Sequence, residues 1–166
     1  AEAGSDGLGF GAGFWGGTRS GATTTTLASG INNSVTTIPL TSATGFDTAA
    51  TTISANIDAV VGLINVASTT GFPAVGIVKI GSEEMYYTSV KSSTALSGIT
   101  RGYNGTTAAS HSSGASATYV GTLVIDEEII TYTGVSTNSL TGAQRLLHMI
   151  LALRLQNLLT LWAGGQ

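Results

Sequence analysis

The chain has 166 residues and a formal net charge of −3, and charged side chains make up only 9% of it, against about a quarter of an ordinary soluble domain. Thr, Gly, Ala and Ser account for 87 of the 166 residues. Six Lys and Arg residues cannot neutralise many phosphates, which excludes a basic nucleic-acid surface. Without cysteine, the chain has no disulfides, thiolate metal sites or cysteine nucleophiles. Low charge with many β-branched residues is typical of a packed β protein and not of a disordered chain.

Residues 1–22 are dense in glycine, and the glycines separate Phe10, Phe14 and Trp15. Fixing so many glycines in a regular element costs too much backbone entropy, so we expect neither a helix nor a sheet here. The segment is either a disordered tail with incidental aromatics or an extended arm that buries its aromatic rings on a partner. We favour the arm, and we take Phe10, Phe14 and Trp15 as candidate partner-binding residues.

Residues 23–142 contain two kinds of internal repeat. The segment 25–46 aligns without a gap with 51–72, and both copies end in Thr-Gly-Phe. The segment 76–88 matches 121–133, with a Glu and a Tyr-Thr pair at the same places. Leu96-Ser97-Gly98-Ile99 then parallels Leu140-Thr141-Gly142-Ala143, and the second copy stops resembling the first at Arg145.

Each repeat unit has the period of a β-strand. Ile38 and Leu40 alternate with polar or small neighbours, as do Val78 and Ile80. Gly81-Ser82 and its counterpart Asp126-Glu127 stand where two-residue hairpin turns would fall. We therefore predict a mainly β fold, a small antiparallel sandwich or barrel built from internal repeats over residues 23–142, with an N-terminal arm and a C-terminal hydrophobic helix.

The third zone, residues 143–166, changes character. From Gln144 through Trp162 the sequence is rich in strong helix formers, and Gly164-Gly165 provides a stop. The apolar residues surround the helix axis, which excludes a simple surface helix. We expect a helix buried among copies of itself or partners, and its candidate partner-binding residues are Leu147, Ile150, Leu151, Leu158 and Trp162.

Two alternatives remain for this tail. A membrane-seeking helix is one, although Arg154 near its middle makes a spanning role costly. The other is a tail that arose by a reading-frame change or recombination, which the coding DNA would decide.

The run from Arg101 to Ala115 is the most distinctive in the chain. Asn104-Gly105 predicts a type I′ turn, because both residues accept a positive φ. Arg101 could bind an anion and His111 could act as a base, but neither has a carboxylate or nucleophile at a defined spacing. We therefore predict a structural loop in which Arg101 and His111 are hydrogen-bonded to nearby carbonyl groups.

The carboxylates suggest a glycosidase or a calcium site at first sight; they are Glu83, Glu84, Asp126, Glu127 and Glu128. Glu83 and Glu128 occupy the same place in two repeat copies, as a structural role requires. The contiguous acids also lack the alternation of a calcium loop. We expect no catalytic residue, no metal and no cofactor.

Several of these residues together resemble a known repeat. They are Gly71-Phe72-Pro73, Gly76 to Gly81, Glu83, Tyr87-Thr88, Leu96 to Gly102 and Gly105 to His111. The pattern is similar to the GFP…G…I…E…YT…L…RG…GTTAA.H..GA module found in structural proteins of tailed-bacteriophage particles. One full copy covers about residues 51–117, and the flanking copies depart from the pattern, with Asp47 in place of the proline. The resemblance implies no catalytic residue.

These observations predict a non-enzymatic structural component of a tailed-phage virion, a multi-copy β module assembled in the bacterial host cytoplasm. It would be a tail, fibre or neck component, or a capsid decoration or cement protein. Its partners would be other virion proteins and copies of itself; we expect no nucleic acid, membrane or small-molecule substrate. The alternative is a carbohydrate- or cell-surface-binding module, with Tyr86, Tyr103, Tyr119 or Trp15 stacked on sugars. A depolymerase and a membrane-active factor are further rivals.

Overall fold

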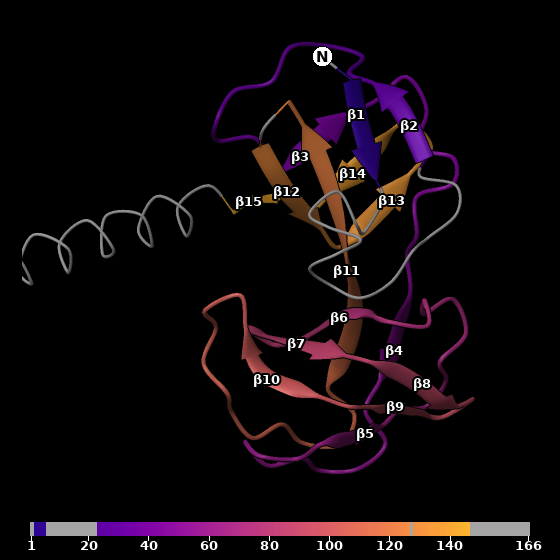
Figure 1. Ribbon diagram of the computed structural model, residues 1–166, viewed down its shortest axis with the longest axis vertical. Coiled ribbons are helices and arrows are strands. Elements are labelled where there is room, and N and C mark those ends of the chain that lie inside the picture. The colour runs from indigo at the N-terminus through magenta and orange to yellow at the C-terminus, as the bar shows by residue number, and fades with distance from the viewer. Residues whose placement is uncertain (1, 6–22, 127, 147–166) are drawn as a thin grey trace, which may run out of the picture.

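The structure is a computed structural model, and it describes residues 2–5, 23–126 and 128–146. These residues form antiparallel β-strands and no helix, which confirms the mainly β class. Figure 1 shows two lobes along the long axis of the molecule, with the long strand β11 (Ser116–Ile125) passing through both. The first half of β11 belongs to one lobe and the second half to the other, so this strand connects the two cores.

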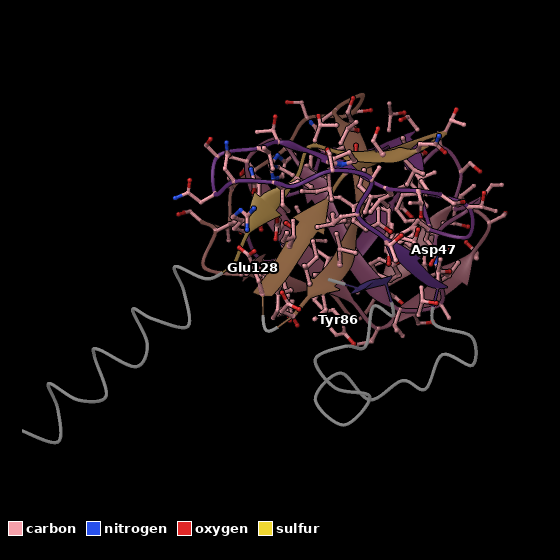
Figure 2. The ribbon with its side chains drawn as sticks, turned by 90° about the horizontal axis from the view of Figure 1, so that it is seen from above. Asp47, Tyr86 and Glu128 are labelled. Atoms are coloured by element: carbon pink, nitrogen blue, oxygen red, sulfur yellow. The ribbon has the colours of Figure 1, made fainter. Side chains whose placement is uncertain are left out.

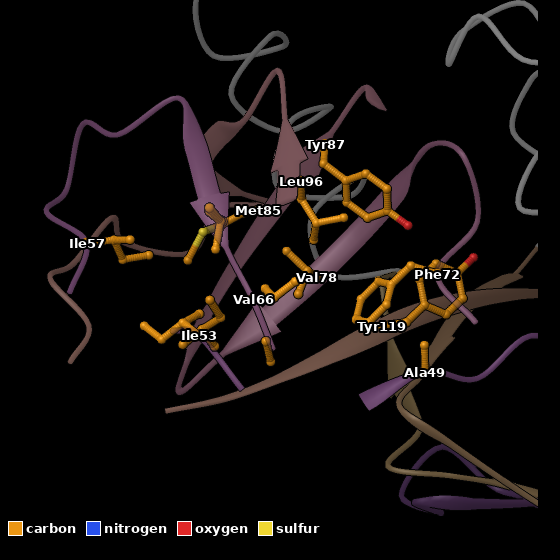
Figure 3. Packing of buried hydrophobic residues seen from close by; sticks show 13 residues of the cluster. Ala49, Ile53, Ile57, Val66, Phe72, Val78, Met85, Tyr87, Leu96 and Tyr119 are labelled. Carbon is orange, nitrogen blue, oxygen red and sulfur yellow. The ribbon is translucent and has the colours of Figure 1, made fainter. Parts of the chain in front are cut away.

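One lobe, the inserted lobe, consists of residues 48–120. Strands β10-β7-β6-β11 and β4, which pairs with β11, are its part of a nine-stranded sheet that continues through β11 into the other lobe, and a smaller sheet has the order β5-β9-β8. The strands are β4 (Ala50–Thr52), β5 (Leu63–Asn65), β6 (Gly76–Ile80), β7 (Glu83–Tyr87), β8 (Ser89–Ser92), β9 (Ala95–Ser97) and β10 (Thr100–Tyr103). Figure 3 shows its core, in which the rings of Phe72 and Tyr119 pack edge to face at one end and aliphatic side chains such as Ile53 and Val66 fill the rest.

The other lobe, the split lobe, is built from residues 2–5, 23–47 and 121–146. Its strands are β1 (Glu2–Ser5), β2 (Thr23–Thr26), β3 (Thr37–Pro39), β12 (Glu128–Tyr132), β13 (Gly134–Ser136), β14 (Ser139–Thr141) and β15 (Gln144–Arg145). The chain leaves this lobe after Asp47 and returns to it at Gly121. The inserted lobe therefore lies within a connection of the split lobe, and its ends meet where the Tyr119 N–H bonds the Ala49 carbonyl at 2.8 Å.

The two lobes share the same internal contacts, which explains the sequence repeat. The Tyr87 hydroxyl donates to the carbonyl of Pro73 at 2.9 Å, and the Tyr132 hydroxyl donates to the carbonyl of Asp47 at 3.2 Å. Each tyrosine also packs edge-on against the phenylalanine of its Thr-Gly-Phe segment, with ring centroids 6.3 and 6.0 Å apart. The repeated residues are thus the core and the core-facing hydrogen bonds of two similar units.

Both predicted hairpin turns are present. Ile80 pairs with Glu83 across Gly81-Ser82, and Ile125 pairs with Glu128 at the equivalent place. Gly81 and Asp126 take positive φ angles of 59° and 53°. A short turn with positive φ matches the right-handed twist of the strands that it joins.

The prediction of a helix starting at Gln144 is wrong at its first residues. Gln144 and Arg145 form strand β15, with Ile130 opposite Arg145 in the antiparallel pair with β12. Pairing with the edge of β12 supplies backbone hydrogen bonds to these residues, and tertiary pairing of this kind overrides local helix propensity. The rest of the predicted helix, residues 147–166, lies outside the described residues.

The expectation that residues 1–22 contain neither a helix nor a sheet is wrong at residues 2–5, where Gly4 is the one glycine and the chain forms a strand. Strand β1 (Glu2–Ser5) is paired on one side with β2 and on the other with β11. This short segment is therefore part of the split lobe's own sheet. Residues 6–22 of the arm lie outside the described residues.

Candidate functional site

The most densely connected polar group in the described residues is the carboxylate of Glu83. Glu83 begins strand β7, directly after the Gly81-Ser82 turn, and its side chain is fully buried. Arg101 comes from β10, the neighbour of β7 in the sheet. His111 comes from the loop beyond β10 and is fixed by a backbone bridge to Ile57. The fold thus brings together three polar residues from separate parts of the repeat.

Five donors surround the Glu83 carboxylate. Arg101 binds it through two parallel hydrogen bonds, Nε to Oε1 and Nη2 to Oε2, each of 2.8 Å. The backbone N–H groups of Gly102 and Ala109 add bonds of 3.0 Å each. His111 Nε2 lies 2.8 Å from Oε2. Because an ionised carboxylate can only accept, His111 carries a proton on Nε2.

This arrangement keeps Glu83 ionised. Burial by itself raises the pKa of Glu83, but hydrogen bonds from Arg101, His111, Ala109 and Gly102 outweigh burial and lower the pKa from 4.5 to about 2. A carboxylate so weakly basic, with its acceptor positions filled from inside the protein, is unsuited to take a proton from a substrate. The cluster of Glu83, Arg101 and His111, called the Glu83 joint below, therefore links β7, β10 and the loop bearing His111 and holds them in place.

The sequence predicted a structural loop for Arg101 and His111, but it missed their principal partner. Arg101 does bond to carbonyl groups, those of Asp58 and Ala109. Both side chains also contact Glu83, which lies 18 and 28 positions earlier in the chain. Spacing along the chain does not reveal this group, because its members meet only when the strands pair. The signal was present in the repeat, which places a glutamate directly after each hairpin turn.

The loop between Arg101 and His111 has its own supports. Asn104 and Gly105 both have positive φ, 53° and 77°, as the predicted type I′ turn requires. The Asn104 amide donates to the buried Glu84 carboxylate at 2.6 Å, and the Glu84 N–H donates to Thr106 Oγ1 at 3.0 Å. Glu84 is therefore a second internal acceptor that secures the same loop.

The split lobe has a counterpart of the Glu83 joint. Arg145 forms an ion pair with Glu128 and donates from Nη2 to the carbonyl of Asn32 at 2.6 Å. These contacts correspond to those of Arg101 with Glu83 and with Asp58, so the repeat extends through Arg145. The counterpart is more open, because 19% of the Arg145 and 22% of the Glu128 side-chain surface is exposed. Figure 2 shows Glu128 at one edge of the molecule.

The tyrosines suggested for sugar stacking have different surroundings. Tyr119 is buried in the inserted lobe at 6% exposure, so it cannot serve as an exposed platform. It packs there because strand β11 directs alternate side chains into the core. Tyr86 and Tyr103 are half-buried and stack on each other, with ring centroids 5.5 Å apart. Burial and the nearby Tyr86 and Glu84 raise the pKa of Tyr103, so its hydroxyl stays protonated.

The candidate partner-binding residues lie outside the described residues; they are Phe10, Phe14, Trp15, Leu147, Ile150, Leu151, Leu158 and Trp162. In the part of the chain that the structure describes, no group of three or more His, Asp or Glu residues is placed to hold a metal ion. No helix in that part is long and apolar enough to cross a membrane.

Comparison of the chain with protein-family models, with curated proteins and with solved structures finds no match.

Proposed function

We propose that this chain is a non-enzymatic structural component of a tailed-phage particle, present in many copies. The proposal rests on what the residues of the repeat motif contact in the structure. Glu83, Arg101, Ala109 and His111 are positions of the repeat that resembles the phage-particle module, and the last three each bond to Glu83 inside the lobe. The most distinctive polar residues of the motif therefore stabilise the fold of the lobe.

The surface chemistry favours assembly over catalysis. Only 9% of the residues are charged, so few charges need to be desolvated when subunits meet. Arg101 and Glu83 are buried against each other and neutralise one another inside the lobe. A small-molecule reaction needs a reachable acid, base or nucleophile, and Glu83 is not reachable.

Within the particle, the chain would be a tail, fibre or neck component, or a decoration or cement protein of the capsid. Its partners would be other virion proteins and further copies of itself. Contact through the glycine-rich arm and the leucine-rich tail remains part of the proposal, with the aromatic and leucine residues named above as anchors.

Immunogold electron microscopy tests the proposal. Antibodies raised against the purified chain should label particles produced by cells that encode it, at one defined structure such as the tail or the capsid surface. Labelling confined to material outside the particles would contradict the proposal. Particles from a strain with the gene deleted serve as the control for antibody specificity.

A carbohydrate-binding role is the second candidate, and the Tyr86–Tyr103 pair favours it. The two rings lie on neighbouring strands, stack on each other and keep part of their surface exposed, and an exposed aromatic ring offers an apolar contact to a ligand. A glycan array with the purified chain tests this role, with Tyr86→Ala as the variant. Binding that disappears in Tyr86→Ala would support it, and a blank array would remove it.

A further inference from the structure

The inserted lobe has a segment over its buried glutamate that the described part of the split lobe does not have. In the inserted lobe, residues 102–114 form a covering segment that passes over Glu83 and along Ile57. The N–H and carbonyl of His111 both bond to the backbone of Ile57, at 2.9 Å each. The same segment supplies the Gly102 and Ala109 N–H groups and the His111 ring to the Glu83 carboxylate.

The split lobe has equivalents of the residues that the covering segment contacts in the inserted lobe. Ile31 stands where Ile57 stands, and it packs against the core of its lobe. Glu128 stands where Glu83 stands and pairs with Arg145, although Arg145 uses Nη1 alone where Arg101 uses both Nε and Nη2. The strand that follows the covering segment also has a counterpart. Ala3 lies opposite Ile125 and Thr25, as Ala117 lies opposite Ile80 and Thr51.

The covering segment itself has no counterpart among the described residues. There, no backbone group bonds to Ile31 as His111 bonds to Ile57. The Glu128 carboxylate accepts a hydrogen bond from Arg145, and no backbone N–H or histidine among the described residues bonds to that carboxylate. The Arg145 Nε atom is buried without a hydrogen-bond partner in the same part of the structure. Nε is a donor and needs an acceptor; what the Glu128 carboxylate lacks, relative to Glu83, is the set of donors formed by two backbone N–H groups and a histidine.

The chain that follows Arg145 does not carry the missing chemistry. After Arg101 come Gly102-Tyr103-Asn104-Gly105, with His111 ten positions after the arginine. After Arg145 the sequence is leucine-rich, with His148 only three positions on. Over the thirteen positions after Arg145 there is no glycine or threonine, and no histidine ten positions on, so this stretch does not match residues 102–114.

We propose that the split lobe binds an extended segment of a partner protein that has the chemistry of residues 102–114. Its backbone would pair with Ile31, and its N–H groups and one histidine would bond to Glu128. The inserted lobe shows this occupant in place on an equivalent site. Such strand addition obtains affinity from main-chain hydrogen bonds and specificity from the buried side-chain contacts. Charge-assisted hydrogen bonds to the Glu128 carboxylate would add to the affinity.

This inference stands on the comparison of the two lobes and is independent of the proposed particle role. A protein outside any virion could use the same site. Failure of the binding experiment below would leave the particle proposal standing, and absence from particles would leave this site standing.

A labelled synthetic peptide with the sequence of residues 102–114 tests the site. We expect saturable binding to the full chain in fluorescence anisotropy. Changing the histidine of the peptide to alanine should weaken binding at least tenfold, and because the protein is unchanged, its folding does not affect this comparison. Glu128→Gln in the protein should weaken binding by a similar factor, whereas Lys91→Ala, an exposed change in the inserted lobe, should leave it unaltered.

Backbone amide spectra of the full chain locate the contact. Peptide addition should shift the signals of Ile31 and Glu128 and leave those of Ile57 and Glu83 in place. No saturable binding, equal binding of the histidine and alanine peptides, or shifts confined to the inserted lobe would each overturn the proposal.

Discussion

Tyr132 donates a hydrogen bond to the backbone carbonyl of Asp47, a residue 85 positions earlier in the chain. The bond joins the two segments of the split lobe across the whole inserted lobe. Tyr87 makes the equivalent bond to Pro73 over only 14 positions. The same contact is therefore local in one lobe and long-range in the other.

Removing either hydroxyl group should lower the stability of the fold. Tyr132→Phe and Tyr87→Phe keep the buried rings and leave a carbonyl without its donor, which costs about 1–2 kcal/mol of unfolding free energy. Urea unfolding followed by circular dichroism measures both. An unchanged midpoint in both variants would contradict the role given to these bonds. Ser54→Ala, an exposed change, is the control.

The Glu83 joint should be the more important of the two carboxylate pairs. Glu83→Gln keeps the shape of the side chain but leaves the Arg101 charge buried without its partner, which costs about 3–5 kcal/mol. Glu128→Gln should cost less, because Glu128 and Arg145 are partly exposed to water. Denaturant unfolding of the two variants side by side gives the comparison. A larger loss for Glu128→Gln than for Glu83→Gln would contradict the assignment.

Stability should depend on pH through the same residue. The pKa of Glu83 is about 2 in the folded protein and 4.5 ordinarily, so the unfolded chain takes up a proton first as the pH falls. The stability that Glu83 contributes is present above pH 4.5 and is lost as the pH falls toward 2. Thermal unfolding between those values should show a steeper decline in the wild type than in Glu83→Gln. Parallel curves would be evidence against the lowered pKa.

Gly121 should not tolerate a side chain. A Cβ at this position would overlap the ring of Tyr132, which crosses directly over the glycine. Gly121→Ala should therefore destabilise the split lobe by about 1–3 kcal/mol, the cost of overpacking a filled core. At Gly62 nothing lies within 4 Å of an added Cβ, and its φ is not positive. Gly62→Ala should be neutral or stabilising by up to about 1 kcal/mol. Differential scanning fluorimetry of both variants checks the contrast, and equal melting temperatures would contradict it.

Much of the fold could be predicted from the sequence, because the repeat and the strand period are local signals. The hairpin turns at Gly81 and Asp126 and the type I′ turn at Asn104 are each encoded by neighbouring residues, and the structure has them where predicted. The alternation of Ile38 with Leu40, and of Val78 with Ile80, correctly marked core-facing positions. Periodicity and turn chemistry need no knowledge of distant partners.

The rest depended on pairing between distant segments. Gln144 and Arg145 have helical propensity, yet they pair as a strand with β12. The partnership of Glu83 with Arg101 and His111 arises only when β7 and β10 lie side by side. The sequence also does not predict that one lobe is inserted into the other, because a repeat shows that units exist and does not show how they are nested.

The central proposal is that the chain is a multi-copy structural part of a phage particle. Quantitative mass spectrometry of particles purified on a density gradient and washed at high salt measures this most directly, with isotope-labelled peptides of this chain as standards. We predict a fixed ratio of many copies per particle, unchanged by further washing. Absence from the washed particles, or an amount that varies with each wash, would contradict the proposal.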